Sequence, residues 1–362
     1  MMPSQRTIGV VTGGGDCPGL NATIRAVVHA AKRQHSWKVI GITDAFSGLI
    51  WPERCRELTF ESTRGILPLG GTILGTTNSK DPFAFPVSEN GGKTTRDYSK
   101  RCFEGMEKLG IDAVIVIGGN GTLAIAERFG RLGMNVVAIP KTIDNDLRCT
   151  DVTLGFDSAL HIATEAVDRL HSTAESHHRV MIVEMMGRDA GWIALYAGVA
   201  GGADVILLPE IPFSIESVCD ALHHREALGR TFSVIAIAEG AKFPERDAAG
   251  KPLPKSIPGL AGNSLAQVIR ERVDKEVRVT VLGHLQRGGT PSPFDRILAA
   301  RFGVEAVELT ARENYGRMVA LQGSDIASVP IADAIEPIRL VDAKNEVLRT
   351  ARALGISFGD AA

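Results

Sequence analysis

Two carboxylates, a lysine and a threonine hydroxyl lie within the seven residues Pro140–Asp146. The apolar run Val136–Ile139 before them is typical of a buried strand, which the proline ends. Asp144 and Asp146 therefore follow the carboxyl end of a strand, where open α/β sheets bind ligands. Together with Lys141, these groups could deprotonate a hydroxyl, hold a magnesium ion and neutralise a phosphate. The alternative is an Asx-rich loop that only caps the next element, which an isolated Asp-Asn-Asp would favour.

Two glycine-rich segments follow other predicted strands and favour phosphate chemistry. Ile8–Thr12 leads into Gly13–Gly19, and Ala113–Ile117 leads into Gly118–Thr122. Glycine lets backbone N–H groups approach phosphate oxygens, and the N-terminus of a following helix adds a favourable potential. Gly13–Gly19 fits neither the glycine spacing of dinucleotide-binding loops nor that of the Walker loop. A single loop of this kind is explained equally well by phosphate binding and by tight packing. Two loops in one half of the chain indicate a polyphosphate ligand.

Further candidate anion ligands are arginines at predicted strand ends or beside glycines. The planar guanidinium group can bind phosphate oxygens in pairs. A histidine in a Gly-His-x-Gln-Arg-Gly-Gly motif fits the same pattern. A glutamate after a strand could accept hydrogen bonds from sugar hydroxyls, although a capping or surface role is equally well supported. These residues are Arg179, Arg188, Arg278, Arg287, His284 and Glu239.

The elements that must position these residues alternate as strand, glycine turn, helix and strand, which indicates parallel sheets with crossover helices. Asn21 is expected to cap the first helix. Lys80–Thr95 is polar with prolines and paired glycines, and we expect an exposed loop. A boundary near Gly155 separates two α/β lobes. Strands are predicted at 8–12, 38–42, 113–117, 136–139, 179–185, 205–208, 234–238 and 277–282, and helices at 22–33, 123–132, 158–171, 292–310 and 344–354.

Size and composition predict a cytoplasmic enzyme. The 362 residues suffice for two domains, and 44% hydrophobic with 23% charged residues is typical of soluble globular proteins. A net charge of −2 gives no overall basic field, so we expect neither a nucleic-acid nor a membrane partner. The five scattered cysteines argue against a disulfide framework and a zinc site. We see no signal peptide, and Trp192–Ala203 is too short to span a bilayer.

In combination, these segments resemble the phosphofructokinase family. The resemblance runs in family order over about residues 8–303. It implies an α/β fold with two Rossmann-like three-layer lobes, mainly parallel sheets, and an active site in the cleft between the lobes. It also implies a donor-binding lobe of residues 1–155 plus about 286–336, and a fructose 6-phosphate lobe of residues 156–285 plus about 337–362. The matching segments are Thr12–Asn21, Gly70–Gly75, Gly118–Thr122, Pro140–Asp146, Met186–Arg188 and Gly283–Gly289.

The implied reaction transfers a phosphoryl group from ATP to the 1-hydroxyl of fructose 6-phosphate, a step of glycolysis, with Mg²⁺. Asp144 matches the general base, and Arg188, Lys141 and Gly15 match groups around the transferring phosphoryl. The family also implies a homo-oligomer, expected to be a tetramer, in which Arg179 and Arg278 act across a subunit interface. The implied sugar-phosphate ligands are Thr142, Asp144, Arg179, Met186, Gly187, Arg188, Glu239, Arg278, His284 and Arg287, with Asp146 in the same loop. The implied donor ligands are Gly15, Asn78, Ser79, Gly118, Gly119, Asn120, Gly121 and Thr122, and the implied metal ligands are Asn120 and Asp144.

Some positions depart from the family pattern. Asn120 stands where most members have a metal-binding aspartate. Asn78 replaces an arginine, for which Lys80 is expected to compensate. These changes motivate the alternative of a sugar-phosphate-sensing paralogue without catalysis, against which the retained Asp144 and Asp146 argue.

Two positions bear on the phosphoryl donor. Gly121 resembles ATP users, because pyrophosphate users commonly carry an aspartate that fills the nucleotide α-phosphate site. Lys141 resembles pyrophosphate users. We expect ATP, since access for the nucleotide is required whereas a lysine serves either donor, and pyrophosphate is the alternative.

Overall fold

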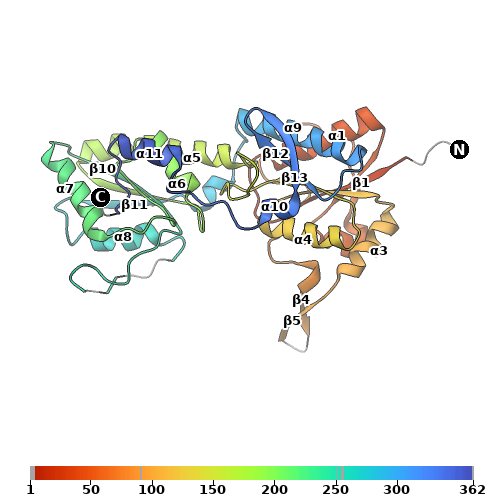
Figure 1. Cartoon of the computed structure of the whole chain (residues 1–362), viewed down its shortest axis with the longest axis horizontal. Coiled ribbons are helices and arrows are strands. Elements are labelled where there is room, and N and C mark those ends of the chain that lie inside the picture. The colour runs from red at the N-terminus through yellow and green to blue at the C-terminus, as the bar shows by residue number, and fades with distance from the viewer. Residues whose placement is uncertain (1–4, 90–91, 251, 254–256, 361–362) are drawn as a thin grey trace. The chain divides into compact units, whose positions relative to one another are not determined.

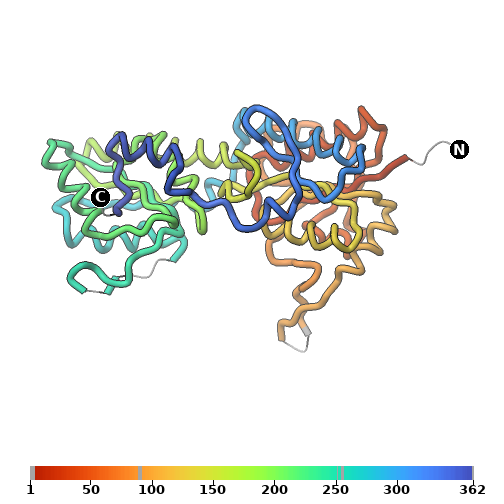
Figure 2. The backbone as a smooth tube through the Cα atoms, in the orientation of Figure 1, coloured from red at the N-terminus to blue at the C-terminus, as the bar shows by residue number. Residues whose placement is uncertain are grey.

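The computed structural model describes residues 5–89, 92–250, 252–253 and 257–360. It divides into two compact units, each an α/β structure (Figures 1 and 2). The assignment of the donor and the sugar phosphate to the expected lobes stays a prediction. The first unit comprises Met1–Ile143, Leu147–Asp157 and Arg287–Ile338, and the second comprises Asp144–Asp146, Ser158–Gln286 and Arg339–Ala362.

The first unit is built on a seven-stranded sheet with the order β13-β12-β7-β6-β1-β2-β3. Only the pairs at its two edges, β12 with β13 and β2 with β3, are antiparallel. The central strands β1, β6 and β7 are buried along their whole length, as expected for parallel strands covered on both faces. The strands are β1 (Thr7–Thr12), β2 (Lys38–Ile42), β3 (Arg56–Glu57), β6 (Ala113–Gly118), β7 (Val136–Pro140), β12 (Arg317–Gln322) and β13 (Asp325–Pro330).

Helices cover both faces of this sheet and make three layers (Figure 1). On one face α1 packs closely on α9, because Gly303 has no side chain: a Cβ there would lie 2.6 Å from the Cβ of Ala26. On the other face Phe129 packs against Phe46, with ring centroids 5.2 Å apart. The helices are α1 (Leu20–His35) and α9 (Pro293–Ala311) on the first face, and α2 (Ser47–Ile50), α3 (Ser99–Leu109), α4 (Asn120–Arg131) and α10 (Ile331–Ile335) on the second.

The expected cap of the first helix is wrong. α1 begins at Leu20, after Gly19 in the left-handed conformation (φ 106°). The buried Asn21 side chain instead donates to the carbonyl of Gly70 (3.0 Å) and accepts from the N–H of Ile73 (2.8 Å). Asn21 therefore fastens the glycine-bounded segment near residue 70 to α1.

The exposure expected of Lys80–Thr95 is confirmed for residues 92–95, but the expected loop is wrong, apart from residues 90–91, which lie outside the described residues. It contains the short turn η2 (Pro82–Ala84) and an antiparallel hairpin of β4 (Phe85–Glu89) and β5 (Gly92–Arg96), which extends from the unit in Figure 1. Phe85 is buried against Tyr98, at 5.5 Å between ring centroids. The described residues of β5 are all exposed. Its sequence lacks the apolar alternation that identifies a strand, which is why the strand was not predicted.

The second unit contains a four-stranded parallel sheet with the order β11-β8-β10-β9. α7 and α8 pack on one face through an apolar core, and α5, α6 and α11 lie on the other (Figure 1). The expected α/β class with mainly parallel sheets is confirmed in both units. The elements are α5 (Phe156–His177), β8 (Val180–Met185), α6 (Trp192–Ala200), β9 (Val205–Leu207), α7 (Ile215–Ala227), β10 (Ser233–Ala238), α8 (Ala261–Ile269), β11 (Val277–Val281) and α11 (Glu346–Ala353), with short turns η1 (Pro52–Arg54) and η3 (Gly283–Arg287) elsewhere.

Within the described residues, no helix combines the length and apolar character needed to cross a bilayer.

Candidate active site

Two glycine loops of the first unit emerge side by side, because β1 and β6 are adjacent parallel strands. The N–H of Gly13 donates to the carbonyl of Ile117 (3.0 Å). Thr122 fills the space between the loops: a Cβ on Gly13 or on Gly118 would lie 2.5 Å from its side chain. These two glycines are therefore required by packing. Gly121, in the first turn of α4, is exposed, and a Cβ added there would meet open space out to 4 Å, so packing does not explain it.

A third segment closes on the first loop. The N–H of Gly14 donates to the carbonyl of Thr77 (3.0 Å), and the Thr76 hydroxyl donates to the carbonyl of Gly14 (2.6 Å). The next residues, Asn78 and Ser79, are exposed beside these glycines. The expected donor ligands Gly15, Asn78, Ser79 and Gly118–Thr122 thus lie on three connected segments of one unit.

Two cations contact the backbone of the first loop. The Lys141 side chain is 3% exposed, and its ammonium group donates to the carbonyl of Gly15. The Arg287 guanidinium donates to the carbonyl of Asp16 (3.1 Å), and a Cβ on Gly15 would lie 2.6 Å from it. Gly15 therefore leaves room for Arg287, and both positive charges lie at the loop where donor phosphates are expected.

Cys17 in the same loop is no nucleophile. Burial raises the pKa of its thiol to about 12, against the opposing effect of the nearby Lys141 charge. The thiol stays protonated at neutral pH and acts as a packing group.

The acidic loop is fixed by backbone contacts. The carbonyl of Thr142 accepts from the Thr153 hydroxyl (2.6 Å), and the carbonyl of Asp146 accepts from the N–H of Arg339 (2.7 Å). Between them the buried Asn145 has a left-handed backbone (φ 50°), which asparagine tolerates better than most residues. Asp144 therefore follows a defined chain path, although the residues that hold this path are drawn from distant parts of the sequence.

In the second unit, the residues after β8 and β10 pack tightly at the carboxyl edge of the sheet. The N–H of Gly240 donates to the carbonyl of Gly187 (3.1 Å), and the N–H of Glu239 donates to that of Met185 (2.8 Å). A Cβ on Gly240 would lie 1.8 Å from the carbonyl oxygen of Arg188, so only glycine fits there. This contact brings the backbone of Met186–Arg188 beside that of Glu239. The structure thus gathers the expected sugar contacts of these two strands.

The exposed His284 follows β11 at the same edge. The N–H of Leu282 donates to the carbonyl of Glu184 (2.9 Å), which joins the end of β11 to β8. The Glu184 side chain, 1% exposed, accepts from the N–H of Gly262 (2.9 Å) in the first turn of α8. Burial raises the pKa of Glu184, against the opposing effect of three backbone N–H groups. Sequence reasoning missed this residue because it lies inside an apolar strand.

Arg179 and Arg278 lie at the opposite end of the strands of this sheet, where the strands begin. Arg179 precedes β8 and Arg278 is the second residue of β11, whereas Arg188 follows β8. At about 3.3 Å per residue, the six residues of β8 separate the two edges by about 20 Å. Glu276 pairs with both arginines, and they lower the pKa of its carboxyl, Arg179 most strongly. The structure therefore does not bring Arg179 and Arg278 to the other expected sugar-phosphate ligands of the same unit.

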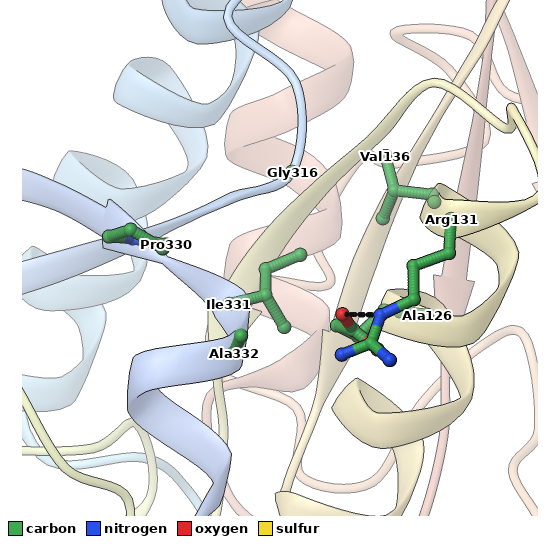
Figure 3. A pocket seen from close by; sticks show the side chains of 9 residues that line it. Ala126, Arg131, Val136, Gly316, Pro330, Ile331 and Ala332 are labelled. Atoms are coloured by element: carbon green, nitrogen blue, oxygen red, sulfur yellow. Dashed lines mark hydrogen bonds and ion pairs between the residues drawn. The ribbon is translucent and has the colours of Figure 1, made fainter.

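A pocket of about 250 Å³ lies elsewhere in the first unit (Figure 3). α4 and α10 line it with mainly apolar groups, including Ala126 and Ile331, and Arg131 pairs with Glu127 (2.5 Å) at its wall. None of the expected site residues lines this pocket, so it does not compete with the glycine loops as the candidate site.

Comparisons with known proteins agree on one family. The family model described as "Phosphofructokinase" matches residues 7–310. An ATP-dependent 6-phosphofructokinase from Chloroflexus aggregans is 49% identical over 360 residues, which cover 99% of each chain. ATP-dependent 6-phosphofructokinase 1 from Synechocystis sp. is 47% identical over 359 residues, which cover 98% of this chain and 99% of the relative.

Solved structures give the same result. The phosphofructokinase of Pichia pastoris in the T-state has a TM-score of 0.79 and 34% identity over 93% of this chain, and the match spans 38% of that longer chain. A pyrophosphate-dependent phosphofructokinase from Marinobacter aquaeolei has a TM-score of 0.80, covers 97% of this chain and 92% of its own, and is 20% identical. The second likeness bears on the fold alone.

Proposed function

This chain belongs to the phosphofructokinase family, and on that premise we propose that it transfers the terminal phosphoryl group of ATP to the 1-hydroxyl of fructose 6-phosphate. The products are fructose 1,6-bisphosphate and ADP. The observation that supports this proposal most directly is the convergence, in the first unit, of three backbone segments and the Lys141 ammonium group on Gly15 and its neighbours. This arrangement suits the phosphates of a nucleotide.

Asp144 is the proposed general base. It lies three residues after Lys141, so its Cα is at most about 11 Å from that of Lys141, whose ammonium group contacts the Gly15 loop. A carboxylate within hydrogen-bond reach of a sugar hydroxyl takes up the proton as the new O–P bond forms. Thr142 and Asp146 flank it as binding and orienting groups of the same loop.

Most of the rate acceleration is assigned to alignment and positive charge, because phosphoryl transfer needs little covalent chemistry from the protein. Lys141 and Arg188 are the proposed cations for the transferring group. Arg287 and His284 are proposed to bind the 6-phosphate, while Met186, Gly187 and Glu239 contact the sugar. The contact of Gly240 with the carbonyl of Arg188 supports a fixed path for this arginine.

The donor set fits magnesium with substrate phosphates as co-ligands. Within the described residues, no three His, Cys, Asp or Glu side chains form a metal-binding group. Magnesium needs no such cage, since it is usually bound by one or two carboxylates, phosphate oxygens and water. Asp144 would supply a carboxylate and Asn120 an amide oxygen, and the bound ion would neutralise charge on the donor phosphates.

Gly121 favours ATP over pyrophosphate as the donor. The position is exposed in the first turn of α4 and has open space beside its Cα, which leaves room for a nucleotide α-phosphate. Asn78, Ser79 and the 118–122 loop are the proposed neighbours of the donor. Lys141 serves either donor, so it does not reverse this choice.

A homo-oligomer is proposed, with a tetramer as the expected state. Arg179 and Arg278 lie at the far edge of the sheet from Arg188, too distant to bind the same sugar phosphate within one chain. If both arginines bind substrate, a second copy of the chain must place the carboxyl ends of its own second-unit strands beside them.

The deciding experiment gives the purified full-length chain fructose 6-phosphate and Mg²⁺ with ATP or pyrophosphate, and identifies fructose 1,6-bisphosphate by phosphorus NMR. We expect turnover with ATP and far less with pyrophosphate. Turnover with pyrophosphate alone would overturn the donor assignment. Sugar-phosphate binding without turnover by either donor would favour a sensor.

A further inference from the structure

One residue beyond the range of the family model joins two proposed site loops of the second unit. Arg339 donates its backbone N–H to the carbonyl of Asp146 (2.7 Å). Its own carbonyl accepts from the indole N–H of Trp192 (2.9 Å). Asp146 lies two residues after the proposed base and Trp192 four residues after Arg188. A single backbone position thus connects the acidic loop to the segment that follows β8.

The side chains strengthen this connection. The Arg339 guanidinium lies over the Trp192 ring, 4.6 Å from its centroid, which is a cation–π geometry. Trp192 is 3% exposed, so its N–H needs a protein acceptor, and Arg339 provides it. Replacing the indole would therefore release the carbonyl of Arg339 without altering a surface residue.

Glu210 makes a second connection close by. Its carboxylate accepts from the N–H of Gly191 (2.9 Å), directly before Trp192, and from the N–H of Val341 (2.9 Å), two residues after Arg339. A Cβ on Gly191 would lie 2.9 Å from this carboxylate, so the approach depends on glycine. The segment Arg339–Val341 is thereby bonded twice to the start of α6.

We propose that Arg339, held by Trp192 and Glu210, is a positioning residue that fixes the acidic loop relative to the Arg188 loop. This inference rests on the proposed function. Phosphoryl transfer depends on the placement of the attacking hydroxyl within about an ångström, and a displacement of that size costs about a hundredfold in rate. The proposed 6-phosphate ligands His284 and Arg287 follow β11 on a different segment, so substrate binding should suffer less than turnover.

The test compares Trp192→Phe, which keeps a buried ring without the N–H donor, with Arg339→Met, which removes the guanidinium. We expect kcat to fall about 10- to 100-fold in Trp192→Phe and about tenfold in Arg339→Met, with a small change in KM for fructose 6-phosphate. Arg339→Lys keeps a cation over the ring and should recover part of the loss.

The matched control is Arg352→Met. Arg352 lies over the ring of Phe358 (4.9 Å) in the same unit, and its guanidinium pairs with Asp360, which belongs to neither site loop. We expect this control to lower the melting temperature as Arg339→Met does while leaving kcat unchanged. Equal kcat losses in the two variants, or a parental kcat in Trp192→Phe, would overturn the proposal.

Amide hydrogen exchange separates this inference from the proposed function. Peptides covering residues 144–146 and 186–191 should exchange faster in Trp192→Phe than in the parent chain, while peptides of the first unit stay unchanged. If the parent chain does not phosphorylate fructose 6-phosphate, the proposed function fails, and the exchange result alone decides whether Trp192 and Arg339 fix the two loops. Unchanged exchange would then overturn the positioning role.

Discussion

The glycines of the two loops that follow β1 and β6 are needed for different reasons. Thr122 excludes side chains at Gly13 and Gly118, whereas Gly121 has open space on its exposed side. A requirement at Gly121 must therefore come from a ligand rather than from folding. The residue thus offers a test of the donor that leaves the fold intact.

Gly121→Asp should lower kcat/KM for ATP strongly, because the carboxylate would occupy the proposed α-phosphate position and repel it. Circular dichroism and the melting temperature should stay close to those of the parent. Gly130→Asp, also in α4 and also with open space out to 4 Å from a Cβ, is the matched control and should leave ATP kinetics unchanged. Unaltered ATP kinetics in Gly121→Asp would argue against a nucleotide at this position.

Asp144→Asn should lower kcat by about 10²- to 10⁴-fold, since the amide cannot accept the hydroxyl proton. Fructose 6-phosphate binding, measured by calorimetry, should change only slightly, because the charge of the sugar phosphate is met by other residues. Asp189→Asn, an exposed carboxylate beside Arg188, is the control and should retain parental turnover. A kcat near the parental value in Asp144→Asn would exclude it as the base.

At the level of elements, Glu184 connects strands and a helix of the second unit. Its backbone carbonyl binds the end of β11, and its carboxylate binds the N–H of Gly262 in the first turn of α8. Glu184→Ala should lower the free energy of unfolding by about 1–3 kcal/mol, because a buried N–H loses its acceptor. Glu184→Gln should cost less, since the amide oxygen can still accept from Gly262. Urea unfolding measures both.

The pH dependence of stability follows from the raised pKa of Glu184. The folded state holds the carboxyl proton of Glu184 more tightly than the unfolded state does. The stabilisation that this proton gives the fold is therefore full below the unfolded pKa and is lost as pH rises through the folded pKa. As pH rises from about 4, near the unfolded pKa, Glu184→Gln should therefore lose less melting temperature than the parent does. Parallel curves for the two proteins would show that the carboxyl does not titrate in this way.

The elements that were predictable from sequence are those with a continuous apolar run. Lys38–Ile42 matches β2, and the expected 136–139 strand is β7 with one added residue. The hairpin β4–β5 was not predictable, because β5 is exposed along its described length and carries polar residues on both faces. The Asn21 cap was wrong because a tertiary contact with Gly70 took the side chain that local preference assigned to the helix end.

The candidate site was predictable to the extent that its residues follow strands. Gly13–Gly15, Gly118–Thr122 and Met186–Arg188 are at the carboxyl ends of β1, β6 and β8, as expected for ligand loops of parallel sheets. Arg339 and Trp192 carried no such signal, since their role depends on a hydrogen bond from an indole N–H to a backbone carbonyl 147 positions away.

At the scale of the whole molecule, an assembly should combine groups from two chains in one site. Asp144 and Arg188 belong to one chain, while Arg179 and Arg278 are expected to come from a neighbour. Each single variant, Asp144→Asn or Arg278→Met, should be strongly impaired. Co-expressed mixtures should recover about a quarter of parental activity if subunits pair at random, because half of the sites in mixed pairs are intact.

The control for this complementation is a mixture of Asp144→Asn with Arg188→Met. Both changes affect the site of their own chain, so in mixed pairs every site carries one defect and no activity should return. Recovery in this control, or none in the Arg278 mixture, would contradict a shared site. Sedimentation of the parent chain should show an assembly, with a tetramer expected.

The pairing of Glu276 with Arg179 and Arg278 has a consequence for affinity. Both guanidinium groups already hold an anion in the isolated chain, so an incoming phosphate must exchange with a carboxylate instead of meeting bare charge. On the proposal that these arginines bind a phosphate group of a neighbouring chain's substrate, Glu276 is a competing anion, and Glu276→Gln should make the two arginines bind phosphate groups more tightly.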